Sequence, residues 1–407
     1  MKEQPRTPRT PRTPTFGALA TPPAAFAAAL IAALIGFGGT VALIVQMGQR
    51  LGGSPGQIIS TVTALCLGIG VAGAGLSFGL RLPIVLAWST PGAALLATSA
   101  AGTTYPVAIG AFIVAAAMMI VLGLVPALGR LAARIPAAVA AAMLAGVLLP
   151  FCLALFRTFQ TDWLLAGLLL AVYIVARQRF PTYALLLVLL AAIIVIATRD
   201  GVGMGVAGSP FGTLIPTAPT FGWRGIISLA IPLFLVTLAS QNLPGFVVLR
   251  SAGYDPPPRP ILVVTGLASL LLAPFGAHSV NLAAITAAIC TGPEAHPQPA
   301  QRWRVGMIYA GLYLLLALFA APLVGLFMAL PPTTIAAITG IALLGPLLNA
   351  LVGMLSVPDD REAAVLTFVT TASGVALLGI GAAFWGLLVG FVALGVRRVL
   401  GKRRERA

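Results

Sequence analysis

The sequence predicts an all-α membrane protein that crosses the bilayer many times. Hydrophobic residues make up 59% of the 407 residues, charged residues only 8%, and the mean hydropathy is +1.04. A soluble domain carries roughly 25% charged residues, so a water-soluble helical core is excluded. An outer-membrane β-barrel alternates apolar and polar residues with a period of two. Here whole segments are apolar, which is typical of membrane-spanning helices.

Apolar runs separated by Gly, Pro and Arg predict fourteen spans. The first seven are 24–47, 56–79, 84–101, 105–125, 136–154, 162–176 and 182–198. A long Gly- and Pro-rich connection, 199–224, precedes the other seven, which are 225–248, 260–273, 275–291, 304–324, 333–352, 363–380 and 382–396. Several runs are too short to cross a hydrocarbon core of about 30 Å alone.

The basic residues predict the orientation of these spans, because Lys and Arg gather on the cytoplasmic side of a membrane protein. With fourteen spans and a cytoplasmic N-terminus, 20 of the 24 basic residues fall inside and four fall outside. Ten of the 24 lie in the predicted cytoplasmic tails 1–23 and 397–407. The net charge of +15 is therefore explained by membrane topology and does not indicate a nucleic-acid partner. The first tail contains an Arg-Thr-Pro repeat and no signal-peptide pattern, so we expect it to be disordered.

Weak internal similarity predicts two halves of seven spans each. Ala93–Gly102 (AALLATSAAG) resembles Ala283–Gly292 (AAITAAICTG), and other short matches follow the same order at offsets near 200 residues. Each match is weak in an alanine-rich chain, and their shared order is the stronger observation. Because each half has an odd number of spans, the second half is expected to be inverted relative to the first.

The third and tenth spans are predicted to be broken half-helices. Ser89, Thr90 and Gly92 lie in a Trp-Ser-Thr-Pro-Gly sequence before one apolar run, and Ser and Thr before Pro are typical of a helix start. Ser279 and Asn281 lie at the equivalent place in the other half, after a Pro-Phe-Gly sequence. A helix N-terminus carries free N–H groups and about half a positive charge. Two such ends meeting in the membrane predict a carboxylate site; kinks in continuous spans are the alternative.

Two amides and three aromatic side chains complete this predicted substrate site. Gln241 and Asn242 lie in the eighth span and need hydrogen-bond partners there, either in a ligand or in a neighbouring helix. Trp88, Phe275 and Phe37 are candidates for an apolar wall around an aromatic ring, although aromatic residues in spans more often serve packing.

His278 is the candidate for proton coupling. It is the only ionisable Asp, Glu, His, Lys or Arg placed inside a predicted span rather than near its end. Histidine has an ordinary pKa of about 6.5, which suits a proton carrier. A carboxylate about 4 Å from the imidazolium would interact with it by up to about 4 kcal/mol at an effective dielectric constant near 20. The alternative is a neutral histidine bonded to a backbone carbonyl.

No cofactor or metal is expected. The three cysteines, Cys66, Cys152 and Cys290, lie in apolar runs without CxxC spacing and are predicted to be small buried hydrophobic residues. Glu294 and His296 in a Pro-rich loop are only a weak sign of a metal site, and a loop or gate role is preferred.

Four sequence segments resemble the benzoate/proton symporter family of the BenE type. They are Ala87–Leu96 (AWSTPGAALL), Gln241–Gly245 (QNLPG), Ala252–Tyr254 (AGY) and Thr265–Trp303. The last segment is long and specific, and the similarity extends over about residues 20–396.

The resemblance implies an importer of benzoate or a related aromatic carboxylate, with a proton, in the bacterial inner membrane. It also implies the inverted-repeat fold of nucleobase and sulfate/bicarbonate transporters, in which homodimers are frequent. A core domain (24–125 and 225–324) would move against a gate domain (136–198 and 333–396), as in an elevator. Nucleobase relatives often have a glutamate in the eighth span, where this chain has Gln241-Asn242. This departure fits an anionic substrate and favours His278 as the proton site.

Two alternatives belong to other functional classes. A membrane-embedded enzyme acting on lipids would need an acidic metal motif or a nucleophile with its base, and none is found. An uncoupled or exchange-type anion transporter or channel of the same fold stays open.

Overall fold

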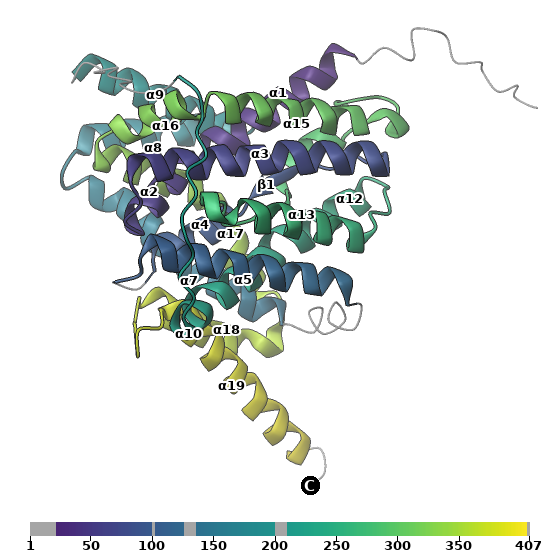
Figure 1. Ribbon diagram of the computed structural model, residues 1–407. Helices are drawn as coiled ribbons and strands as arrows, with labels where there is room; N and C mark the ends of the chain where they lie inside the picture. The colour runs from purple at the N-terminus through teal and green to yellow at the C-terminus, as the bar shows by residue number, and fades with distance from the viewer. Residues whose placement is uncertain (1–21, 100–101, 126–135, 200–209, 405–407) are drawn as a thin grey trace, which may run out of the picture.

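The computed structural model describes residues 22–99, 102–125, 136–199 and 210–404. Most of the predicted N-terminal tail, the end of the C-terminal tail and two predicted cytoplasmic arginines, Arg130 and Arg134, lie outside the described residues. The described part is mostly helical, and its long helices pack side by side in layers (Figure 1).

The first half of the chain begins with a helix that is broken at Gly39-Thr40. Its elements are α1 (Pro23–Gly38), α2 (Val41–Arg50), α3 (Pro55–Leu80), β1 (Leu86–Trp88), α4 (Thr90–Ala97), α5 (Tyr105–Leu124), α7 (Ala137–Thr158), α8 (Trp163–Arg179) and α9 (Ala184–Arg199). Local chemistry fixes the start of α3, where Ser54 and Gln57 form a reciprocal capping box and Pro55 occupies the first helical position.

The second half contains the same alternation of long helices and one strand. The stretch equivalent to the predicted eighth span is α10 (Trp223–Gly225), η2 (Ile226–Ala230), α11 (Ile231–Thr237), η3 (Leu238–Asn242) and α12 (Leu243–Ser251). The following elements are α13 (Pro258–Leu272), η4 (Ala273–Phe275), β2 (Val280–Leu282), α14 (Ile285–Thr291), η5 (Pro299–Gln301), α15 (Trp303–Leu318), α16 (Ala320–Ala329), α17 (Pro332–Leu355), η6 (Pro358–Asp360), α18 (Arg361–Ala372) and α19 (Ala382–Arg404).

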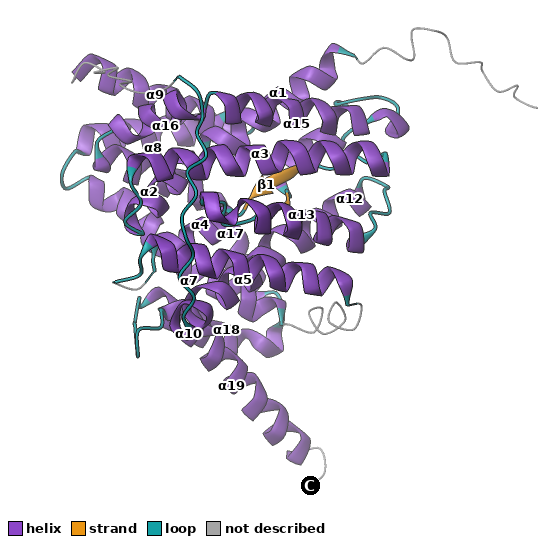
Figure 2. Cartoon of the chain, in the orientation of Figure 1, coloured by secondary structure: helices purple, strands orange, loops and turns teal. Residues whose placement is uncertain are grey.

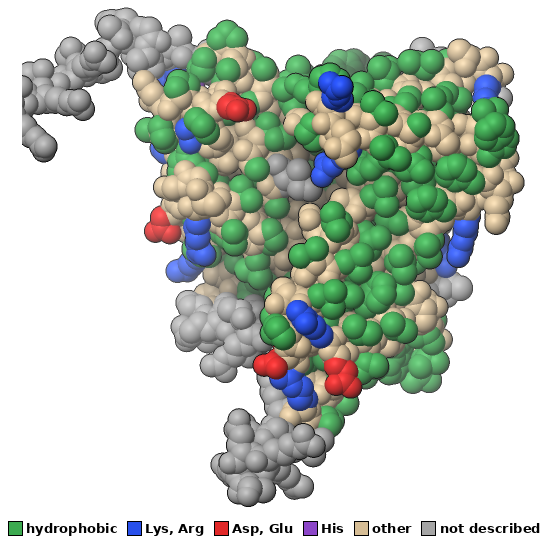
Figure 3. Space-filling view, turned by 180° about the vertical axis from the view of Figure 1, so that it is seen from behind, with side chains coloured by type: hydrophobic (Ala, Val, Ile, Leu, Met, Phe, Trp, Pro, Cys, Tyr) green, Lys and Arg blue, Asp and Glu red, His purple; other side chains and the backbone are tan. Residues whose placement is uncertain are grey.

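Seven helical stretches within the described residues are long and apolar enough to cross a membrane, or eight if α15 and α16, bent by 66°, count as one span. The other predicted spans correspond to β1 with α4, β2 with α14, α8, α9, α18 and α19. A multi-pass membrane protein is therefore confirmed. On the face in Figure 3, hydrophobic side chains are numerous and charged side chains are few.

Three predicted spans are not continuous α-helices over their whole predicted length. The tenth is extended up to Leu282, and its helix begins only at Ile285. The thirteenth ends at Ala372, because Gly374 takes a positive φ of 67° and terminates the helix. The eighth contains two π-helical stretches, each just before a proline, which cannot donate an ordinary helical hydrogen bond.

A two-stranded antiparallel ribbon lies in the interior of the molecule (Figure 2). Leu86 pairs with Leu282, Ala87 with Asn281 and Trp88 with Val280. The ribbon contacts α3, α13 and η3. The predicted all-α class therefore needs this correction, and the ribbon brings residues about 190 positions apart in the sequence into direct contact.

The helices form two groups by their contacts. Around the ribbon, α3 packs on α15 and α5 on α13, whereas α7 packs on α17 and α18, and α18 on α19. Small residues allow the closest approaches in the second group, since a Cβ on Gly146 would meet Thr371 and one on Gly340 would meet Leu155.

The segment 210–222 runs extended across α3, α13 and α5 (Figure 1). Backbone N–H groups of Gly212, Thr217 and Thr220 donate to carbonyls of Leu318 (2.7 Å), Pro274 (2.8 Å) and Pro106 (2.9 Å). This strap therefore joins helices of the first group that are far apart in the sequence.

Candidate functional site

The start of α4 is held by its own N-cap residue. Ser89 is fully buried, and its hydroxyl accepts a hydrogen bond from Gly92 N–H at 2.9 Å. Its carbonyl accepts from Ala93 N–H at 2.8 Å. Of the first three helical residues, Pro91 has no N–H and the Gly92 N–H is already bonded to Ser89. The Thr90 amide is therefore the one backbone donor left in this turn.

His278 lies opposite Ser89, in the extended segment before β2. Its Nε2 is 3.0 Å from the carbonyl oxygen of Ser89. A carbonyl only accepts, so Nε2 must carry the proton and donate it in this bond. Within the described residues the other ring nitrogen, Nδ1, is buried and has no hydrogen-bond partner. In the neutral imidazole, Nδ1 is therefore the atom that is able to take up a proton.

Asn281 also holds Ser89. Its amide is satisfied when the oxygen accepts from Ser89 N–H (3.2 Å) and from the Ser279 hydroxyl (3.3 Å), while the nitrogen donates to the Val280 carbonyl (3.1 Å). His278 and Asn281 thus bind the carbonyl and the amide of the same residue, the N-cap of α4.

The two amides of the eighth span have different surroundings. Asn242 is fully buried; its oxygen accepts from Leu282 N–H at 3.1 Å, and its nitrogen approaches the Met119 sulfur at 3.7 Å. It therefore fixes the end of β2. Gln241 is partly exposed on η3, an element that contacts α7 and the ribbon.

Trp88 lies in an aromatic cluster that includes only one of its predicted partners. Its ring centroid is 5.7 Å from that of Phe37 and 6.1 Å from that of Tyr313. The indole N–H donates to the Thr40 hydroxyl at 2.8 Å. Phe275 is absent from the ring contacts found for Trp88 in the described residues; its carbonyl accepts from the Ser60 hydroxyl at 2.9 Å.

The prediction that two helix N-termini meet stays a prediction; the structure gives the register of the two strands that lead to α4 and α14. Ile285, the first residue of α14, follows Asn281 by four positions, and each helix follows its own strand of an antiparallel ribbon. The starts of α4 and α14 therefore lie at opposite ends of that ribbon. The start of α4 contacts the extended segment that contains His278 and Asn281.

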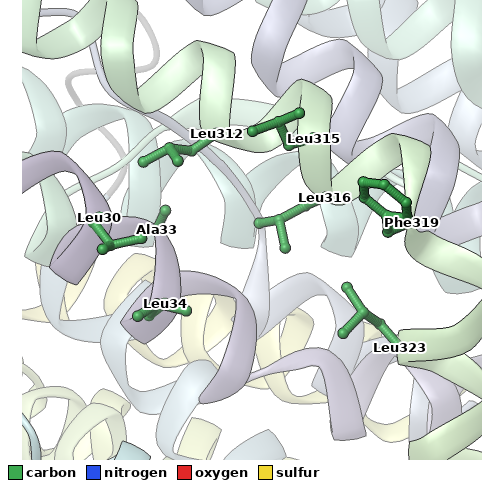
Figure 4. A pocket seen from close by; sticks show the side chains of 8 residues that line it. All are labelled: Leu30, Ala33, Leu34, Leu312, Leu315, Leu316, Phe319 and Leu323. Carbon is green, nitrogen blue, oxygen red and sulfur yellow. The ribbon is translucent and has the colours of Figure 1, made fainter. Parts of the chain in front are cut away.

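An apolar cavity of about 210 Å³ lies between α1, α15 and α16. Figure 4 shows its lining, which consists of hydrocarbon side chains: Leu30, Ala33, Leu34, Leu312, Leu315, Leu316, Phe319 and Leu323. Because it has no polar lining side chain, it is not a carboxylate site. Within the described residues no group of three or more His, Cys, Asp or Glu is placed to hold a metal ion.

Comparison with known proteins identifies the family. The family model described as benzoate membrane transport protein, BenE, matches residues 19–396. This chain belongs to the BenE family.

Two curated proteins are similar to this BenE chain over nearly its whole length. The inner membrane protein YdcO of Escherichia coli is 42% identical over 387 residues, covering 94% of this chain and 98% of the relative. The benzoate membrane transport protein of Acinetobacter baylyi is 35% identical over 379 residues, covering 90% and 93%.

Solved anion transporters share the fold of this BenE chain. The transmembrane domain of the cyanobacterial bicarbonate transporter BicA matches with a TM-score of 0.59 at 15% identity, over 91% of this chain and 96% of that one. SLC26A9 matches with a TM-score of 0.62 at 15% identity, over 92% and 65%. The chain is thus a membrane transporter by family, and not an enzyme.

Three residues near the BenE ribbon were missed or ranked low by sequence reasoning: Thr40, Tyr309 and Thr237. Thr40 accepts from Trp88, and the Tyr309 hydroxyl donates to the Leu86 carbonyl at 3.0 Å. The hydroxyl of Thr237, one turn before Gln241, is buried without a partner in the described part of the chain. Available signals were the Gly-Gly-Thr break in the first span, two tyrosines four residues apart, and a threonine on the helix that carries Gln241.

Proposed function

We propose that this protein imports benzoate or a related aromatic carboxylate together with a proton across the bacterial inner membrane. The family and the fold support anion transport. One observation carries the proton coupling: His278 is fixed through Nε2 to the residue that caps α4, while Nδ1 stays unpartnered.

The proposed carboxylate position is the outer side of the first turn of α4. Thr90 and Gln241, both partly exposed, are the donors, and Trp88 with Phe37 forms the wall for the aromatic ring. Phe275 is retained as a candidate wall residue. The other predicted binding residues, Ser89, Gly92, Asn242, Ser279 and Asn281, are largely engaged with protein groups and are proposed to shape the site.

Coupling follows from charge and from the shared residue Ser89. Protonation at Nδ1 makes His278 a cation, which strengthens its hydrogen bond to the Ser89 carbonyl. The positive charge on His278 then lies next to Ser89, the residue that precedes the first turn of α4, where the carboxylate is proposed to bind. Each charge favours the binding of the other, so the anion and the proton enter together.

For the whole chain we propose fourteen segments in two inverted halves, with both termini cytoplasmic. The two groups of helices correspond to the core and gate domains, and the ribbon belongs to the core. Transport is the movement of the core against the gate, in contact with membrane lipid and in a possible homodimer. Hydrogen bonding between Gln46 on α2 and Thr339 on α17 (3.0 Å) joins the two groups in the present state.

Proteoliposomes test the proposal. One benzoate anion with one proton carries no net charge, so one pH unit supplies about 1.4 kcal/mol, or tenfold accumulation. Uptake should be driven by a pH gradient, abolished by a protonophore and insensitive to membrane potential. Strong acceleration by potential alone would refute the one-to-one stoichiometry.

His278→Gln tests the proton site, since glutamine keeps a donor for the Ser89 carbonyl but cannot become a cation. We expect benzoate-driven proton uptake to fall at least tenfold. Full pH-driven accumulation by this variant would remove His278 from the coupling role. An uncoupled or exchange-type transporter, the alternative, would move benzoate in the wild type without any proton flux.

A further inference from the structure

A second, much smaller cavity lies behind the ribbon, between α5, α11, α13 and β2. Its lining includes Ala115, Met119, Phe234, Thr237 and His278. The cavity has a volume of about 10 Å³, which admits a water molecule and little more. An aromatic acid does not fit there, so this cavity is distinct from the carboxylate position.

Two unpartnered polar atoms belong to residues that line this cavity. In the described part of the chain six buried side-chain atoms have no hydrogen-bond partner, and Thr237 Oγ1 and His278 Nδ1 are two of them. Both side chains are almost fully buried, at 2% and 1% exposure. Leaving two such buried groups unpaired is unfavourable, so a bridging water is the expected solution.

The other polar groups around the cavity are already bonded to protein. The Ser269 hydroxyl donates to the Thr265 carbonyl and accepts from Val280 N–H, both at 2.8 Å. Asn281 is satisfied by the Ser89 amide and its neighbours. The water therefore has His278 and Thr237 as its natural partners.

We propose that this cavity is a water site in which the Thr237 hydroxyl, through one water, positions and stabilises the proton that arrives on His278 Nδ1. This inference deepens the proposed proton coupling and rests on it. Thr237 acts as a positioning residue: the protonated Nδ1 donates to the water, and the water donates to the Thr237 oxygen. The proton leaves by the reverse transfer when His278 returns to its neutral form.

No other ionisable side chain lines the cavity. The element α5 presents Ala115, Ala116 and Met119 there, with the Phe112 ring 6.2 Å from the His278 ring. The remaining lining residues of α11, α13 and β2 are uncharged. Tyr105, a titratable residue outside the cavity lining, lies beside Gly276, and its hydroxyl hydrogen-bonds Thr61. If a substitution at Thr237 shifts the pH profile of proton uptake, the shift therefore reports on the protonation of His278.

The test compares Thr237→Val, which keeps the shape and removes the hydroxyl, with Thr237→Ser, which keeps the hydroxyl. Benzoate-driven proton uptake is measured in proteoliposomes across pH. In Thr237→Val we expect the pH of half-maximal uptake to fall by about one unit, because the protonated imidazole loses its partner. Thr237→Ser should match the wild type. A wild-type pH profile in Thr237→Val would overturn the inference.

A second readout keeps the inference separate from the proposed function. The chain has two histidines, so a His296→Gln background leaves His278 as the single imidazole for ¹⁵N NMR. We expect Nε2 to carry the proton in the neutral form, and the Nδ1 resonance to change in Thr237→Val but not in Thr237→Ser. An unchanged Nδ1 resonance in Thr237→Val would contradict the water site. Benzoate uptake without proton flux in the wild type would instead contradict the proposed function alone.

Discussion

At the scale of single residues, the structure shows how a turn places His278 against α4. Gly276 ends η4 with a positive φ of 98°, a conformation that costs energy for any residue with a Cβ. A Cβ there would also collide with the hydroxyls of Thr61 and Tyr105, which hydrogen-bond each other at 2.7 Å. The turn that leads to His278 therefore requires glycine.

Gly276→Ala should lower the stability of the protein by about 1–3 kcal/mol, the range of a strained backbone position with a steric clash. The measurement is the melting temperature of the purified protein in detergent. Gly75→Ala on α3 is the matched control, because a Cβ there meets no atom within 4 Å. Equal melting temperatures for the two variants would mean that the turn accommodates a Cβ at position 276 without loss of stability.

At the scale of elements, an arginine side chain from elsewhere in the chain donates to carbonyls at the end of each short helix that follows the ribbon, α4 and α14. Arg302 donates to the carbonyls of Thr291 and His296, both at 2.8 Å, at the end of α14. Arg50 donates to the Ser99 carbonyl at 3.0 Å, just after α4. A cation at a helix C-terminus stabilises the unpaired carbonyls and the negative end of the dipole. Carbonyls at the C-terminal ends of α4 and α14 thus have hydrogen-bond donors in these arginines.

His296 in the α14–α15 connection is held neutral by the same arrangement. Burial, with a smaller effect from the positive charges of Arg304 and Arg302, lowers the pKa of His296. Its neutral Nδ1 accepts from Gln298 N–H at 3.1 Å. The loop that the sequence marked as weak metal-ligand material is therefore a capping structure for α14.

Arg302→Gln should destabilise the protein by about 1–3 kcal/mol, since a buried hydrogen-bonded charge is lost and the carbonyls lose a partner. Arg302→Lys should rescue only part of this, because an ammonium lacks the planar fork that donates to both carbonyls. The exposed Arg50→Gln should cost less. Thermal unfolding ranks the three; a full rescue by lysine would show that charge alone matters.

At the scale of the whole molecule, the two groups of helices predict where movement occurs. Gln46 and Thr339 join the proposed core and gate by one hydrogen bond. Linking them covalently should block transport if the groups move past each other, because a covalent bond cannot be exchanged as a hydrogen bond can.

The double variant Gln46→Cys/Thr339→Cys, treated with a short bifunctional thiol reagent, should lose at least nine-tenths of its benzoate uptake. The three native cysteines, Cys66, Cys152 and Cys290, are present in every variant, so a loss confined to the double variant reports on the new pair. Each single variant, treated in the same way, is the control. Unchanged uptake by a fully cross-linked double variant would exclude relative movement at this contact.

The sequence by itself determined the membrane class, the family and the two broken spans. Apolar runs, Gly-Pro breaks and an isolated histidine are local features, and the bilayer excludes other structures for such a chain. The sequence also indicated His278 as the one ionisable group placed inside a span.

Only the tertiary structure decided the chemistry around His278. The antiparallel register places His278 against Ser89, 189 residues away, and thereby fixes which ring nitrogen is free. Helix packing brings Thr237 to the same cavity as His278. Such partners depend on the strand register and on helix packing, where a shift of one residue turns each strand side chain to the opposite face.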